Sequence, residues 1–201
     1  MCVRLSLTYI FKDQQFSDFR RTLDAEMKRL RSLGIGTSTK QAEPITDTEE
    51  QRLFDLCKLG PDTPQSLLDT MVYMCGLYFA LRSGQEHRHL SVDQIKLVEP
   101  TDDVTYLVYT ENVSKNNQGG LHHRKLKPKT VIHHVNLKEP SRCFMMFYTA
   151  YMAHRPQNLK HNAFYLTPIH NPKTEVWYSS IPVGYHTLMV TVNRLCYTAS
   201  I

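Results

Sequence analysis

The segment between Leu67 and Leu81 limits the possible folds more than any other part of the chain. Its apolar side chains fall on nearly every side of a helix. They are Leu67, Leu68, Met71, Val72, Met74, Cys75, Leu77, Tyr78, Phe79 and Leu81. A helix that is apolar all round has to be covered by other elements. We therefore expect a helix that begins near Pro64, ends at Arg82 and forms the buried centre on which the rest of the chain packs.

Helical signals also occur before and after this segment. Before it, five apolar residues recur at steps of three and four, and these are Phe16, Phe19, Leu23, Met27 and Leu30. Gly34 and Gly36 end that helix, and Thr46 or Asp47 is suited to cap a short helix that reaches Cys57. Two more helices are predicted at residues 142–154 and 185–199.

Three β-rich runs lie between these helices, at residues 96–99, 105–113 and 131–135. The last two are joined by a polar stretch with two glycines at its tip, as in an antiparallel hairpin. Shorter extended pieces are predicted at 163–168 and 176–178. The predicted fold class is therefore mainly α with a small three-stranded antiparallel sheet (α+β).

A polar stretch that ends in Pro44 divides the chain and is typical of a linker. The expected domain organisation is an N-terminal helical arm at residues 1–36, a linker at 37–45 and a main body at 46–201.

Composition excludes several classes of protein. Of the 201 residues, 41% are hydrophobic and 21% are charged, which is ordinary for a globular domain. No window of about eighteen apolar residues exists to span a membrane, and the N-terminal stretch contains Arg4 and no signal-peptide cleavage site. The five cysteines include no Cys-x-x-Cys pair, so they indicate neither a disulfide framework nor a zinc knuckle. We expect an intracellular protein with reduced thiols.

Residues 114–129, called the basic segment below, contain five basic side chains and no acid. These are Lys115, Arg124, Lys125, Lys127 and Lys129. Because the net charge of the chain is only +5, this local concentration carries the argument for nucleic acid. Such side chains neutralise DNA phosphates, and Lys115 beside a scissile phosphate is suited to protonate a leaving sugar oxygen. The alternative is a solvated hairpin tip.

Arg82 lies where the apolar helix emerges, four residues before Glu86. A planar guanidinium held by a carboxylate makes two parallel hydrogen bonds to a phosphate. The alternative is an arginine that interacts with the negative end of the helix dipole.

Histidines and tyrosines also suggest chemistry, but a packing role is favoured for both residue types. His133 and His134 would point to opposite faces of a strand, so they cannot both bind one metal ion. Tyr185 and Tyr197 are nucleophiles by residue type, yet tyrosines on an apolar helix are expected to be core or interface groups. We expect no metal and no cofactor.

Several stretches are similar to one known family. They are LLDTMVYMCGLYFALRSGQEHR (67–88), ENVSKNNQGGL (111–121), SRC (141–143), HRP (154–156), AFYL (163–166) and VWY (176–178). Together they resemble the domain derived from Crypton-type tyrosine recombinases that occurs in animal nuclear proteins, including MYM-type zinc-finger proteins and glutamine-rich relatives. The resemblance extends from about Phe16 to Ile201.

The resemblance implies a helical catalytic domain with a small sheet, preceded by the end of a helical core-binding domain. In active tyrosine recombinases, two arginines and a His or Trp hold the scissile phosphate, a hairpin lysine is the general acid and a tyrosine is the nucleophile. Arg82 resembles the first arginine and Lys115 the hairpin lysine. The usual carboxylate position is occupied by Gln85, with Glu86 one residue later. No His-x-x-Arg occurs in the chain, so the resemblance implies a domain that is incomplete at its C-terminus.

The sequence therefore predicts a nuclear, non-catalytic module that binds the backbone of duplex DNA and associates with transcription or chromatin proteins, with no membrane contact. The predicted DNA contacts are Arg82, Arg88, Lys115, Arg124, Lys125, Lys127 and Lys129. Two alternatives remain open. One is a protein-interaction scaffold in a transcriptional complex, and the other is a fragment of an active DNA-integrating recombinase.

Overall fold

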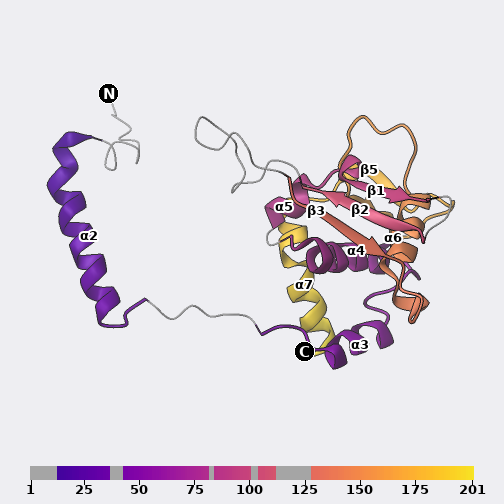
Figure 1. Ribbon diagram of the computed structural model, residues 1–201, viewed down its shortest axis with the longest axis horizontal. Helices are drawn as coiled ribbons and strands as arrows, with labels where there is room; N and C mark the ends of the chain where they lie inside the picture. The colour runs from indigo at the N-terminus through magenta and orange to yellow at the C-terminus, as the bar shows by residue number, and fades with distance from the viewer. Residues whose placement is uncertain (1–12, 37–42, 82–83, 101–103, 112–127) are drawn as a thin grey trace. The chain divides into compact units, whose positions relative to one another are not determined.

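The computed structural model describes residues 13–36, 43–81, 84–100, 104–111 and 128–201 (Figure 1). The chain divides into two compact units, Met1–Pro44 and Ile45–Ile201. Each unit is described by itself below.

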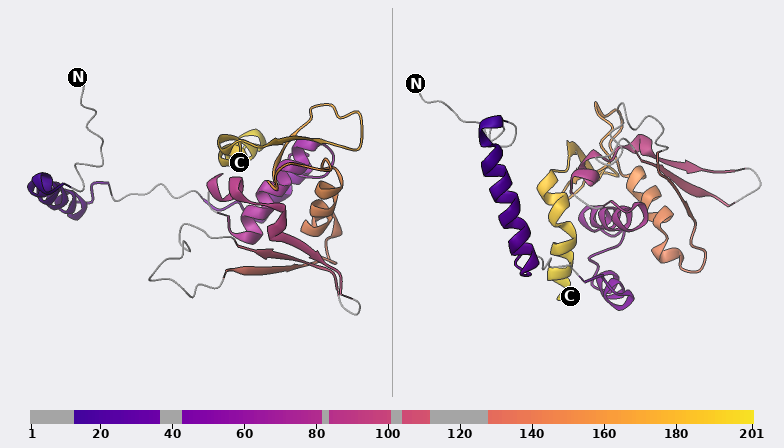
Figure 2. Two further views of the ribbon diagram at one scale, coloured as in Figure 1. Left: turned by 90° about the horizontal axis from the view of Figure 1, so that it is seen from above. Right: turned by 60° about the vertical axis from the view of Figure 1, so that its left-hand side comes forward.

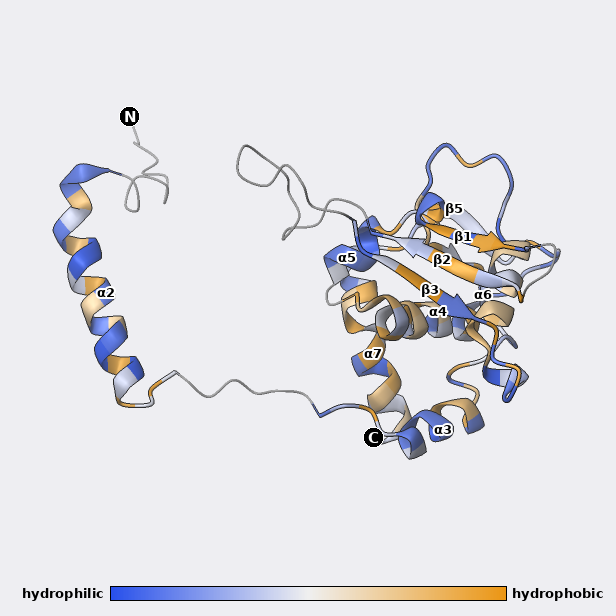
Figure 3. Ribbon diagram, viewed as in Figure 1, coloured by the Kyte–Doolittle hydropathy of each residue, from blue (hydrophilic) through white to orange (hydrophobic). Residues whose placement is uncertain are grey.

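The first unit contains a 3-10 turn, η1 (Gln14–Phe16), and the amphipathic helix α2 (Ser17–Ser32). Gly34 and Gly36 have φ angles of 73° and 74°, so the helix ends where the glycines predict. No residue of α2 is buried. Polar and apolar residues alternate along the helix in Figure 3.

The second unit is a mixture of helices and strands. Its helices are α3 (Asp47–Asp55), α4 (Pro64–Phe79), α5 (Gly84–His89), α6 (Phe144–Ala153) and α7 (Tyr185–Ala199), with the 3-10 turns η2 (Val92–Gln94) and η3 (Pro140–Arg142). Its strands are β1 (Ile95–Val98), β2 (Tyr106–Thr110), β3 (Thr130–His134), β4 (Leu166–Pro168) and β5 (Tyr178–Pro182). Two views agree that α4 lies between the three-stranded sheet and α7 (Figure 2).

Helix α4 is the buried centre that the sequence predicts. Thr63 caps its first turn in a reciprocal pair with Ser66, and Pro64 occupies the first position. Eleven of its sixteen residues are buried. The helix ends at Phe79 rather than at Arg82, because Ala80 adopts the left-handed conformation with φ 53°. Within the described residues, no helix is both long enough and apolar enough to cross a membrane.

The predicted three-stranded antiparallel sheet is confirmed, in the order β1-β2-β3. Leu107 of β2 pairs with Leu97 on one side and with His133 on the other. The sheet packs against α4 through Tyr109, whose ring stacks on Phe79 with centroids 4.3 Å apart. A second sheet pairs β4 with β5. The sequence predicts extended pieces near these strands but not their pairing.

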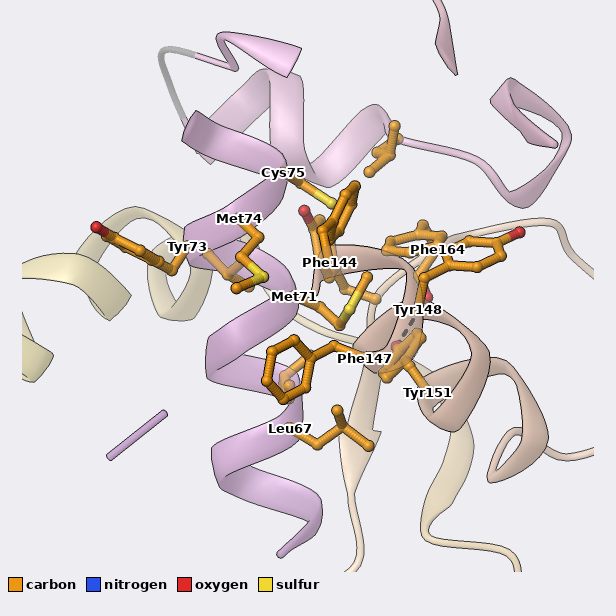
Figure 4. Close-up of a cluster of buried hydrophobic side chains, with 14 of the residues drawn as sticks. Leu67, Met71, Tyr73, Met74, Cys75, Phe144, Phe147, Tyr148, Tyr151 and Phe164 are labelled. Atoms are coloured by element: carbon orange, nitrogen blue, oxygen red, sulfur yellow. Dashed lines mark hydrogen bonds between the residues drawn. The ribbon is translucent and has the colours of Figure 1, made fainter. Parts of the chain in front are cut away.

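Side chains from α4 and α6 point toward one another and form much of the core (Figure 4). Those drawn from α4 include Leu67, Met71 and Cys75, which meet Phe144 and Phe147 of α6. The core thus holds the sheet, α4 and α6 together as one body.

Helix α7 covers another side of α4. Its Arg194 makes an ion pair with the buried Asp69 of α4 at 2.6 Å. Burial raises the pKa of Asp69, although Arg194 acts in the opposite direction. Tyr197 of α7 is 85% exposed, so it is not the core residue that one interpretation of the sequence expects.

Candidate nucleic-acid interface

Of the seven predicted DNA contacts, the structure describes two. Arg82, Lys115, Arg124, Lys125 and Lys127 lie outside the described residues. Arg88 on α5 and Lys129 just before β3 are described. The geometry of the candidate site therefore rests on these two side chains and on the described residues that precede and follow the others.

The end of α4 meets the base of the basic segment. Lys129 Nζ donates a hydrogen bond to the Phe79 carbonyl at 3.0 Å. Lys129 also accepts a hydrogen bond through its own carbonyl, from the backbone N–H of Glu111 at 2.8 Å. The end of α4, the end of β2 and the start of β3 therefore lie at one edge of the second unit (Figure 1). We call this place the α4 edge.

Helix α5 is fixed beside the α4 edge by a buried histidine. His87 is 8% exposed, and its Nδ1 lies 2.9 Å from the Tyr165 hydroxyl. The ring also makes a hydrogen bond to the Leu81 backbone. Gly76 of α4 lies under the ring, where an added Cβ would be 3.5 Å from His87 Nε2. A neutral imidazole that accepts at Nδ1 and donates at Nε2 satisfies both partners.

Burial lowers the pKa of His87 to about 4 from its ordinary value of 6.5. Between these values the unfolded chain binds a proton that the folded chain does not, so the free energy of unfolding falls as the pH decreases from 6.5 to 4. The expected contribution of His87 to this loss is about 3 kcal/mol. Urea unfolding of wild type and His87→Gln at pH 7 and pH 4.5 measures it, and the variant should lose less stability than wild type on acidification.

His134→Gln is the matched control for this measurement, because His134 is exposed on the sheet. It should lose as much stability as wild type between the two pH values. If His87→Gln and His134→Gln lost the same free energy of unfolding on acidification, the pH-dependent loss of stability could not be assigned to His87.

Two acidic residues lie near the α4 edge. Burial raises the pKa of Tyr109 to about 12, and the carboxylates of Glu111 and Glu86 act in the same direction. These charges reduce the positive potential that the basic side chains can produce there. Gln85 of α5 lies with its Nε2 3.1 Å from His89 Nε2.

Arg88 lies on a different side of α5 from His87 and is half-buried. It lines a hollow of about 310 Å³ together with His89, Ser91, His161, Asn162 and Pro182, among others. His161 and Asn162 were not singled out in the sequence. They are about seventy residues away from Arg88 in the chain, and only the fold brings them together.

The histidine pair in β3 is placed as expected for a strand. The His133 ring packs on Tyr78 and Phe144, with centroids 4.3 Å and 5.4 Å away. His134 is exposed and contacts the Tyr106 ring instead. In the parts of the chain that the structure describes, no three His, Cys, Asp or Glu side chains are grouped to hold a metal ion.

Comparison with known proteins places the chain in a family. Residues 44–197 match the family model described as Domain of unknown function (DUF3504), and the chain therefore belongs to that family. It is 26% identical over 200 residues to Zinc finger MYM-type protein 3 of Mus musculus, and the aligned region covers 92% of this chain and 14% of that protein. It is 29% identical over 195 residues to Zinc finger MYM-type protein 2 of Homo sapiens, covering 88% and 14%.

A third relative has a different name. The chain is 25% identical over 157 residues to Transcriptional regulator QRICH1 of Homo sapiens, and the aligned region covers 73% of this chain and 20% of that protein. The chain thus spans a fifth or less of the length of the curated relatives it matches. No solved structure matches it. The DUF3504 domain is shared with MYM-type zinc finger proteins and with a transcriptional regulator.

Proposed function

We propose that this domain is a DNA-binding module that is derived from a tyrosine recombinase and acts without cutting DNA. It works in the nucleus, within proteins that regulate transcription or chromatin. The names of its relatives support the regulatory part of this proposal. The observation that carries the DNA-binding part is the contact between Lys129 and Phe79, because it brings the base of the basic segment to the end of α4.

Chain connectivity links this contact to the predicted phosphate ligands. Arg82 follows Phe79 by three residues, which limits the separation of their Cα atoms to about 11 Å. Lys127 precedes Lys129 by two residues, for which the limit is about 7 Å. Arg82 and Lys115 are the proposed pair at one phosphate, and Arg88, Arg124, Lys125 and Lys127 are the proposed contacts with neighbouring phosphates. Contacts of this kind position a duplex without reading its sequence.

The proposal predicts salt-sensitive binding to duplex DNA of unrelated sequences. Removal of a phosphate contact in Arg82→Ala or Lys115→Ala should weaken binding about tenfold. It should also reduce the slope of log affinity against log salt by about one. Fluorescence anisotropy with a labelled duplex between 50 and 200 mM salt measures both quantities.

Lys138→Ala is the matched control, because Lys138 is exposed and follows the opposite end of β3 from Lys129. The control changes the net charge equally but should leave the slope unchanged. Equal losses in Lys115→Ala and Lys138→Ala would show that binding depends on net charge alone. The wild-type chain is expected to leave a nicked suicide substrate uncut, and a covalent DNA adduct would refute the non-catalytic part.

A protein-interaction scaffold is the second candidate, and the outer side of α7 favours it. Arg194 is the only charged residue of α7, and several of its apolar or aromatic residues are exposed. These are Tyr185, Met189, Val190 and Tyr197, with exposed fractions of 38%, 47%, 43% and 85%. A nuclear partner retained by wild type and lost by Tyr197→Asp, together with no measurable binding to duplex DNA, would favour this function over the first.

A further inference from the structure

The hollow beside Arg88 has walls that are fixed by the backbone. It is lined by residues 88–91 and 161–163, together with Pro182. The backbone N–H of Val92 donates to the Asn162 carbonyl at 2.9 Å. The backbone N–H of Phe164 donates to the Leu90 carbonyl, also at 2.9 Å. The two sides of the hollow are therefore held together whatever their side chains bind, as expected of a preformed ligand site. We call this place the Arg88 hollow.

The guanidinium of Arg88 is available to a ligand. Arg88 is half-buried, and within the described residues it makes no hydrogen bond, ion pair or ring contact. None of the described residues that line the hollow is acidic. A guanidinium carries five N–H donors in a planar fork that matches the oxygens of a phosphate or carboxylate. The unpaired charge therefore favours an anion in the hollow.

Two further side chains of the lining keep an N–H group free for the same anion. The Nε2 of Gln85 lies 3.1 Å from His89 Nε2. Because an amide nitrogen only donates, His89 Nε2 accepts and the ring proton lies on Nδ1. Asn162 Nδ2 donates one of its two N–H groups to the Asp93 carboxylate at 2.8 Å, which leaves the other. Since Asp93 brings a negative charge to this amide, Arg88 has to supply the positive charge that holds the anion.

His161 forms part of the wall and is not a free donor. Its Nε2 donates to the Ser180 carbonyl at 2.9 Å, and its Nδ1 accepts from the backbone N–H of Ala163 at 3.3 Å. Both ring nitrogens are thus occupied by contacts within the domain. The free donors of the hollow come from Arg88 and His89 on one side and from Asn162 on the other.

We propose that the Arg88 hollow binds a single phosphate group, with His89 and Asn162 as additional donors. A carboxylate has two oxygens, and the fork of one guanidinium already satisfies both. A phosphate has further oxygens that can accept from His89 Nδ1 and from the free N–H of Asn162. The inference rests on the proposed DNA-binding function, for which it names the pocket and two new phosphate ligands. A phosphodiester of a duplex and a free phosphate share this chemistry, and the experiments below distinguish them.

A titration with inorganic phosphate tests the hollow without DNA. In NMR spectra of the ¹⁵N-labelled chain at pH 7, phosphate should shift the Arg88 side-chain Nε–H signal and the backbone N–H signals of His89 and Asn162. Sodium chloride at the same ionic strength should not produce these shifts, and neither should phosphate added to Arg88→Gln. The signal of Arg52, an exposed arginine on α3, serves as the internal control and should not move.

Binding to a labelled duplex tests whether the phosphate comes from DNA. Arg88→Gln should weaken binding about tenfold and reduce the slope of log affinity against log salt by about one. Asn162→Asp should weaken binding at least as much, because it adds a negative charge to the hollow while Arg88 remains. Arg52→Gln and Asn171→Asp make the same changes of charge at exposed residues outside the lining and should have little effect. Thermal melts confirm that each variant is folded.

The two measurements separate failure of the hollow from failure of the proposed function. If phosphate shifts the Arg88 signal but wild type binds no duplex, the DNA-binding function fails and the hollow is a site for a free phosphate group. If wild type binds duplex, but phosphate shifts nothing and Arg88→Gln behaves as Arg52→Gln does, the phosphate site is wrong and the DNA-binding function stands. Shifts as large with acetate as with phosphate would also overturn it, because they would identify a carboxylate site.

Discussion

Phe144→Ala is expected to lower the free energy of unfolding by about 4 kcal/mol, the range measured for large-to-small changes in a tightly packed core. The Phe144 side chain is fully buried. Its ring lies 5.4 Å from that of Tyr78 and 5.5 Å from that of Phe79, with His133 on a third side. Truncation therefore leaves a cavity between α4, α6 and β3. Urea unfolding followed by circular dichroism measures the loss.

Met146→Ala is the matched control on the same helix. Met146 is 59% exposed, so its truncation should change stability by less than about 0.5 kcal/mol. If both variants of α6 lost similar stability, the assignment of Phe144 to the centre of the core would be wrong.

Arg155→Leu is expected to cost about 3 kcal/mol, because it removes charge-assisted hydrogen bonds from a buried site. Arg155 is 6% exposed. Its guanidinium donates to the Phe164 carbonyl, and to the Ala163 carbonyl at 2.9 Å. Those two residues lead into β4, so the substitution loosens β4 where it packs against α6. The free energy of unfolding in urea again provides the measurement.

Arg155→Lys should recover part of the stability, since one ammonium can reach one of the two carbonyls but lacks the planar fork of the guanidinium. Arg52→Leu removes an exposed arginine from α3 and should be almost neutral. A loss in Arg155→Leu no larger than that in Arg52→Leu would show that the buried hydrogen bonds add nothing to stability.

Local signals explain which helices can be predicted from the sequence. Helix α7 begins at Tyr185 directly after Gly184 and ends at Ala199, as predicted, because its apolar periodicity and the flanking residues are short-range features. Thr46 likewise caps α3 through a reciprocal pair with Glu49. The predicted end of α4, at Arg82, is wrong, because the helix ends at Phe79. Alanine rarely adopts positive φ, so nothing in the sequence indicates that Ala80 ends the helix.

Pairings across long stretches of chain could not be predicted in the same way. The three-stranded sheet could be predicted, because its strands are rich in residues that favour β structure and two of them flank a glycine-containing connection. The pairing of β4 with β5 has no such local signal. Burial of Arg155 also contradicts the ordinary preference of arginine for the surface. Its hydrogen bonds to two carbonyls and its position over the Tyr151 ring explain it.

The candidate site was predictable as a set of charges but not as an arrangement. Composition identifies the basic segment, and Arg82 stands out beside an apolar helix. That Lys129 contacts Phe79, fifty residues earlier, depends on the way β3 packs beside α4. The partner of His87, Tyr165, is 78 residues away. The sequence therefore identifies the basic residues but does not separate those that face a ligand from those that stabilise the fold.

Gly84 is a point where α5 and α7 are in close contact. A Cβ at residue 84 would lie 2.9 Å from Met189 Cβ, so the two helices touch with no space for even one methyl group. Such a contact transmits displacement instead of absorbing it. A protein that bound the outer side of α7 and shifted this helix would therefore also shift α5, which carries Arg88. If the domain binds DNA as proposed, partner binding and DNA affinity are thermodynamically linked, each changing the other by the same factor.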